Sequence, residues 1–146
     1  EAAEATAEAM LPMVKGAWEG LRRRAKSVQS SHPSPTDENL HRVRIHAKRL
    51  RYAAETVAPV IGKPARAFAR RTQRLQSVLG EYNDAVVAAA WLRDWAADAA
   101  DPAAAFAAGE LAGLELETAR AGREAWRKPY ERLGAKSLRR WMDRPL

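Results

Sequence analysis

Basic side chains recur at helical spacing in one segment of this 146-residue sequence. His41, Arg44, Lys48 and Arg51 follow one another at intervals of three, four and three residues, which places them along one side of a helix. At a rise of 1.5 Å per residue, they form a stripe about 15 Å long. Arginine offers paired planar donors and lysine a mobile positive charge, so this stripe is suited to phosphate-like anions.

A second basic stripe follows in the next segment. It falls within about a quarter of a helix circumference and consists of Lys63, Arg66, Arg70 and Arg74. The two segments are joined by a short turn, so we expect them to be antiparallel neighbours. Their stripes would then flank one groove or surface.

The charge of the chain is concentrated in these two segments. Residues 42–74 hold ten basic side chains against Glu55 alone, a net charge of +9, whereas residues 75–118 carry a net charge of −7. The whole chain reaches only +7. Like charges four residues apart, such as Arg44 and Lys48, destabilise a helix by a few tenths of a kcal/mol. Uncompensated repulsion of this kind favours an external anion as the partner, with an ordinary solvated basic face as the alternative.

The elements that carry the stripes are long helices. Apolar residues recur at helical spacing in about 2–28, 37–60, 64–99 and 102–126, with a shorter terminal helix in 130–142. Thr36 is suited to an N-cap, Gly62 to a helix end and Pro64 to a first helical turn. Pro12 predicts a kink or the true start of the first helix. We therefore predict a single all-α domain over 1–146, an antiparallel four-helix bundle plus a short C-terminal helix.

The predicted packing includes the second half of the bundle. The buried side of the third helix is expected to continue through Trp91 and Trp95, with a bend at Gly80. We expect the fourth helix to break at Lys128-Pro129 and to bury Phe106, Leu111, Leu114 and Ala121. Opposite charges four residues apart predict that the tail pairs its own charges, as Arg120–Glu124 and Arg127–Glu131.

Several classes of function are disfavoured by composition. The chain has no cysteine, which excludes disulfides, thiol catalysis and cysteine-ligated zinc. His41 and His46 do not share a helix face, so we predict no metal site and no cofactor. No apolar run approaches the roughly 20 residues that span a bilayer, and the N-terminus lacks a signal-peptide layout. The chain does not begin with methionine, and we expect it to be part of something longer.

Two motifs resemble a known family. Leu40–Glu55 reads LHRVRIHAKRLRYAAE, with histidine, arginine three later, lysine four after that, then Leu-Arg-Tyr and glutamate. Leu75–Ala85 reads LQSVLGEYNDA. In this order and separation they resemble the two motifs of CHAD domains, the conserved histidine α-helical domains. The strong likeness covers 40–95.

The resemblance implies binding of inorganic polyphosphate by basic side chains, without catalysis. It assigns the first motif to His41, Arg44, Lys48 and Arg51, and more loosely the basic second helix to Arg66, Arg70 and Arg74; Lys63 is added to the candidate site from its helical spacing alone. It treats Glu55, Gly80 and Asp84 as structural motif residues, Gly80 for close helix approach and Asp84 for orienting a basic side chain. It also implies a cytoplasmic protein at polyphosphate granules and an association with a triphosphate-hydrolysing CYTH domain.

The chain departs from that family in its length. The usual domain is about twice as long and has two similar halves, of which this chain resembles the second. A second half supplied by homodimerisation or by a longer chain is the expectation. Ile45 and Tyr52, on the far face of the basic helix, are candidates for the junction, unless they are merely scattered exposed residues.

Two other classes of function remain to be weighed. Non-specific nucleic-acid binding is the alternative, but only Tyr52 borders the stripe, whereas single-strand binders interleave aromatic and basic residues. Phosphoryl transfer needs acids and Mg²⁺ beside the cations, and Glu55 is the single acid in 42–74. We therefore predict a binding module and no enzyme.

Overall fold

The computed structural model describes residues 2–31 and 35–143, with side chains described from residue 5 onward. All regular structure in these ranges is helical. The elements are α1 (Ala2–Gln29), α2 (Asp37–Ile61), α3 (Lys63–Asp98), α4 (Pro102–Ala125), α5 (Arg127–Leu133), α6 (Lys136–Arg139) and the 3₁₀ turn η1 (Arg140–Met142). The prediction of an all-α fold with long packed helices is confirmed.

The helix ends follow local chemistry. The Thr36 side chain accepts a hydrogen bond from the Asn39 backbone amide at 3.2 Å and so caps α2. Gly62 separates α2 from α3 with a φ of 86°, a conformation that favours glycine, and Pro64 occupies the first turn of α3. α1 is helical from Ala2 onward, so Pro12 does not mark its start.

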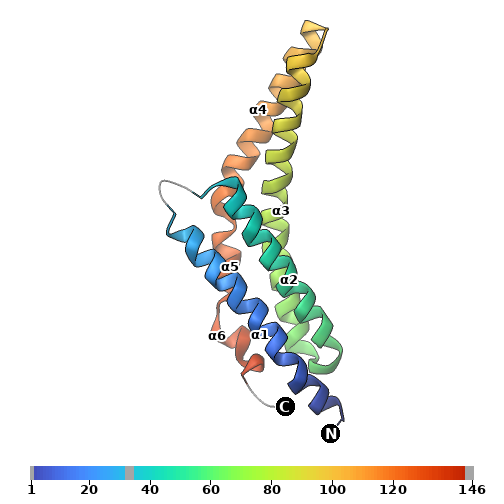
Figure 1. Cartoon of the computed structure of the whole chain (residues 1–146), viewed down its shortest axis with the longest axis vertical. Coiled ribbons are helices and arrows are strands. Elements are labelled where there is room, and N and C mark those ends of the chain that lie inside the picture. Colours follow the sequence, from blue (N-terminus) through green and yellow to red (C-terminus); the bar gives the residue numbers. More distant parts are fainter. Residues whose placement is uncertain (1, 32–34, 144–146) are drawn as a thin grey trace.

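The helices pack in the order of the chain. α1 lies against α2, α2 against α3, and α3 against α4 and α5. Their shared core contains the predicted stripes of the first two helices and that of the third as far as Val86, and in it Phe68 meets Trp18 and Trp141 edge to face. α2 and α3, which carry the basic stripes, are direct antiparallel neighbours in this arrangement (Figure 1).

The outer part of α3 and α4 forms a two-helix arm that extends past the ends of α1 and α2 (Figure 1). Between its helices the arm buries Ala89, Ala108 and Ala112. The prediction that large residues fill this part of the bundle is wrong, because the exposed residues include Trp91, Trp95, Phe106, Leu111 and Leu114. Ala121, farther along α4, was also predicted to be buried and is exposed. Small residues let the two helices approach closely, which turns the bulky side chains outward.

The C-terminal region is more broken than predicted. α4 ends at Ala125, within one residue of the predicted end, but Lys128-Pro129 lies inside α5 and does not break a helix. The expected terminal helix is divided among α5, α6 and η1. The two predicted ion pairs are also wrong in their partners. Arg120 pairs with Glu117 at 2.8 Å and Arg127 with Glu124 at 2.5 Å, each three residues earlier in the chain. α3 is helical throughout Lys63–Asp98, so Gly80 does not interrupt it.

Candidate polyanion-binding surface

The residues at the two ends of the α2 stripe form hydrogen bonds with α3. His41 Nδ1 lies 3.1 Å from Asn83 Oδ1, a contact that the Nδ1–H tautomer makes as a donor. Arg51 donates to Gln76 Oε1 at 3.3 Å and to Glu55 Oε1 at 2.7 Å. These bonds align the whole stripe with residues 76–83 of α3. Both partners, Gln76 and Asn83, were missed from the sequence, although their spacing of seven residues places them on one side of α3.

Arg44 and Lys48, in the middle of the α2 stripe, form no side-chain hydrogen bond with the described residues. Arg44 is half-buried, and its Nε is a buried donor with no partner. Lys48 Nζ and the Arg51 guanidinium lie 5.7 and 5.5 Å from the centre of the Tyr52 ring. Tyr52, 49% exposed, is thus an aromatic support for two of the cations, a role that the sequence did not reveal.

The two basic stripes occupy different lengths of the α2–α3 hairpin. Because Arg51 contacts Gln76, Arg74 and the residues before it lie beyond the Arg51 end of the α2 stripe, toward the turn at Gly62. Along the helix axes the α3 stripe therefore follows the α2 stripe and is not level with it. We call the combined set the basic track; at 1.5 Å per residue it is about 30 Å long. Its members are His41, Arg44, Lys48, Arg51, Lys63, Arg66, Arg70 and Arg74.

Most cations of the basic track lack an internal counter-charge. In the described part of the chain, no ion pair or hydrogen bond joins another side chain to Arg44, Lys48, Lys63, Arg66, Arg70 or Arg74. Some cations elsewhere are paired, such as Arg22 with Glu19 at 3.0 Å and Arg123 with Asp37 at 2.8 Å. The track is thus a surface of uncompensated positive charge.

The three motif residues behave differently from one another. Glu55 holds Arg51, as a structural motif residue would. Asp84 is exposed and has no bonded partner among the described residues, so it does not orient a basic side chain in this structure. An added Cβ at Gly80 would lie 3.7 Å from Arg44 Nε, an ordinary contact. Close helix approach therefore does not require a glycine there.

His46 faces α1, away from the basic track. It lies in a hollow of about 340 Å³ with Gly20, Arg23, Arg24 and Ser27. Burial, and after it the positive charges of Arg49, Arg24 and Arg23, lower the pKa of His46 below its usual 6.5. The residue packs between α1 and α2.

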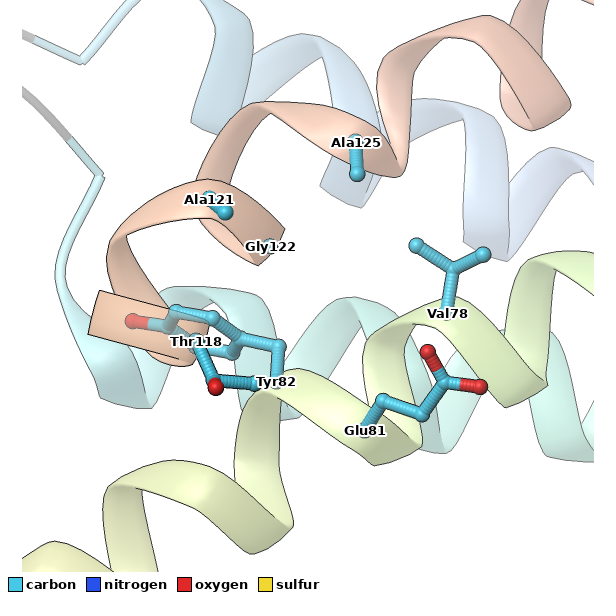
Figure 2. A pocket seen from close by; sticks show the side chains of 7 residues that line it. All are labelled: Val78, Glu81, Tyr82, Thr118, Ala121, Gly122 and Ala125. Atoms are coloured by element: carbon cyan, nitrogen blue, oxygen red, sulfur yellow. The ribbon is translucent and has the colours of Figure 1, made fainter. Parts of the chain in front are cut away.

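A separate hollow between α3 and α4 has the wrong chemistry for phosphate. Figure 2 shows Val78 and Tyr82 on α3 opposite Ala121, Gly122 and Ala125 on α4, with the Glu81 carboxylate beside them. This hollow of about 370 Å³ is lined by no basic side chain. Its mostly apolar walls and its carboxylate would repel an anion that the basic track attracts.

The described residues contain no metal site and no membrane-spanning helix. In residues 2–31 and 35–143, no group of three or more histidine or acidic side chains is placed to hold a metal ion. No helix in the same ranges is long and apolar enough to cross a membrane.

Comparison with known proteins gives one match. The family model of the CHAD domain matches residues 1–93, which include all of α1 and α2 and most of α3. No curated protein and no solved structure matches the chain. The matched region contains the whole basic track, whereas most of the outer α3–α4 arm lies beyond it.

Proposed function

Because the chain belongs to the CHAD domain family, we propose that it binds inorganic polyphosphate along the basic track. The observation that carries this proposal is the row of six cations without an internal partner, including the buried, unpaired Nε of Arg44. A buried donor without a partner costs free energy, about 1–3 kcal/mol, which the Arg44 side chain would recover by turning outward to donate to a phosphate oxygen.

The shape of the track favours a linear polyanion over a compact one. Charged groups follow one another over about 30 Å along two helices, so a single phosphate could contact only a few of them at a time. A chain of phosphates could contact many. Arginine side chains would grip phosphate oxygens in pairs, and the lysines would add mobile charge.

Non-specific binding to the phosphates of nucleic acid is the alternative function. Trp91 and Trp95 are exposed, contrary to prediction, and exposed aromatic residues can stack on bases. They lie, however, in the stretch of net charge −7, which repels phosphate. Only Tyr52 lies within the track, and its ring is already contacted by Lys48 and Arg51.

The deciding experiment is competition between long-chain polyphosphate and DNA at equal phosphate concentration over a range of salt. We expect polyphosphate to displace labelled DNA from the protein at every salt concentration. Preference for DNA would overturn the proposal in favour of the alternative.

Binding without turnover is part of the proposal. Glu55 is the single acid within 42–74, and it is engaged by Arg51, which leaves no free carboxylate in the segment to hold Mg²⁺ or accept a proton. A binding module of this kind would bring its protein to polyphosphate granules and could act beside a CYTH-type domain. Co-localisation of a fluorescent fusion with granules, lost when track residues are neutralised, tests the targeting.

A second half of the binding domain would be supplied by another copy of this chain or by a longer chain. The outer arm supports this idea better than the predicted junction does. Ile45 is half-buried and Tyr52 contacts two cations of the basic track, whereas seven of the nine large apolar side chains that are exposed among the described residues lie between Val87 and Leu116. Light scattering over a concentration series tests homodimerisation, and a monomer at high concentration would contradict it.

A further inference from the structure

The outer arm has an unusually weak interior for a pair of long helices. Between residues 87 and 116, which make up the outer arm, the only buried residues are alanines. The large apolar side chains there point to solvent: Trp91 is 63% exposed and Phe106 is 68% exposed. Each alanine buries little area, so the arm gains little from its own packing. A partner that covers the outward face would supply the missing burial.

The outward face of α3 changes character along its length. At 100° per residue, one exposed sector of about 140° contains Arg66, Arg70 and Arg74 near the start of the helix and Val87, Trp91 and Trp95 near its end. The first half of this face is basic. The second half is aromatic and is accompanied by exposed acids, among them Asp84, Asp94 and Asp98.

When two copies of this face meet with their α3 helices antiparallel, the basic half of each lies opposite the aromatic and acidic half of the other. If two α3 helices lie antiparallel, with residue numbers that add up to 161 opposite each other, each cation meets an apolar or acidic residue. The opposed pairs are Lys63 with Asp98, Arg66 with Trp95, Arg70 with Trp91, Arg74 with Val87, and Ser77 with Asp84. Arginine over tryptophan is a favourable cation–π arrangement. A two-fold axis creates every pair twice.

We infer that this face of α3 is a self-association surface on which two copies of the chain pair antiparallel, with the axis between Gly80 and Glu81. Charge selects this arrangement over one in which the arms meet side by side, because each arm lies in the stretch of net charge −7 and two arms would repel each other. The arm of one copy then lies over the basic half of its partner's α3.

This pairing has a consequence for the basic track, which rests on the proposed function. Arg66, Arg70 and Arg74 belong both to the track and to the self-association surface. Polyphosphate and the partner's arm would therefore compete for them, while the α2 stripe stays accessible. Binding of the polymer would release the arm, and this antiparallel pairing would hold the α3 half of the track closed. It is therefore a different association from the one in which a second copy completes the binding domain.

Cysteine cross-linking tests the register because the native chain has no cysteine. The double variant Ser77→Cys, Asp84→Cys brings the two thiols of opposite copies together in the inferred register. Within one chain, or between two copies of Ser77→Cys alone, the thiols are separated by about 10 Å, too far for a disulfide. We expect the double variant to form a covalent dimer under mild oxidation and the single variant to remain monomeric on a denaturing gel. Equal cross-linking of both variants would overturn the register.

Surface variants test the same interface without cysteine. Trp91→Lys removes an opposed aromatic residue and places a second cation opposite Arg70, so it should weaken self-association more than about tenfold in sedimentation. Leu114→Lys, also exposed on the arm but on α4, is the matched control and should leave self-association unchanged. Loss of association in the control alone would move the interface to α4 and refute the inference.

The competition is tested by adding polyphosphate to the double cysteine variant before oxidation. We expect the yield of covalent dimer to fall. An unchanged yield at a polyphosphate concentration that saturates binding would refute the competition. If polyphosphate does not bind at all, the proposed function fails, while the cross-link still decides the interface.

Discussion

Neutralising the basic track should change the salt dependence of polyphosphate binding by an amount that the structure sets. Six cations of the track have no internal partner. By analogy with nucleic acids, each phosphate-contacting cation contributes about 0.7–0.9 to the slope of log affinity against log salt. The native chain should therefore show a slope of about −4 to −5, equivalent to a loss of about 500-fold between 50 and 200 mM salt.

The triple variant Arg44→Gln, Lys48→Gln, Arg70→Gln retains three of the six cations. Its slope should fall to about −2 to −3, so the same salt change should cost it only about 25-fold. Titration with polyphosphate at four salt concentrations, followed by calorimetry, measures both slopes. Circular dichroism should show an intact helical fold, because removing like charges four residues apart relieves repulsion.

The matched control neutralises two exposed cations of the C-terminal region, Arg132→Gln and Lys136→Gln, neither of which has a bonded side-chain partner. Arg139 is unsuitable, because it donates to the Gly134 carbonyl at 2.9 Å and lies over the Trp18 ring. If the control lowers the slope as much as the triple variant does, or if the triple variant keeps the native slope, the site has been placed wrongly.

Three further predictions concern stability and are read by thermal or chemical unfolding. Tyr82→Phe removes the hydroxyl that donates to Asp37 and should lower the free energy of unfolding by about 1 kcal/mol, whereas an unchanged value would mean that the hydrogen bond does not stabilise the fold. Gly62→Ala forces a side chain into a φ of 86° and should cost about 1–2 kcal/mol, and a gain in stability would contradict the strain. Because the pKa of His46 is lowered in the folded chain, the unfolded chain binds the proton more tightly, so the histidine's contribution to stability is present above pH 6.5 and is lost as pH falls below it. His46→Gln should remove this part of the pH dependence of stability. Identical curves of stability against pH for the variant and the native chain would refute the role given to His46.

The first three helices could be predicted closely from the sequence because their signals are local. Thr36 caps α2 through a bond within its own first turn, and Gly62 turns the chain by its own backbone conformation. The stripes that contain Leu21, Leu50 and Leu75 are buried as their periodicity predicted. In the matched family region, periodicity and burial agree because each helix there has neighbours on its apolar side.

The fourth helix shows where such reasoning fails. Phe106, Leu111 and Leu114 fall within about 140° of the circumference of α4, and the alanines Ala108 and Ala112 lie outside that sector. Hydrophobicity favours the large residues as the buried set, but two helices without a third beside them pack most closely through the small ones. Which stripe is buried depends on which neighbours exist, and a one-dimensional pattern does not contain the neighbours.

The sequence by itself determined the helical class, the basic stripe of each helix and the family, because spacing along a helix and residue type are local properties. The tertiary structure decided how the stripes combine. The bond of His41 to Asn83 and that of Arg51 to Gln76 fix the axial offset of α2 on α3, and this offset places the α3 stripe beyond the Arg51 end of the α2 stripe. It also decided that the tryptophans of the arm face outward, because α1 and α2 end before they could cover them.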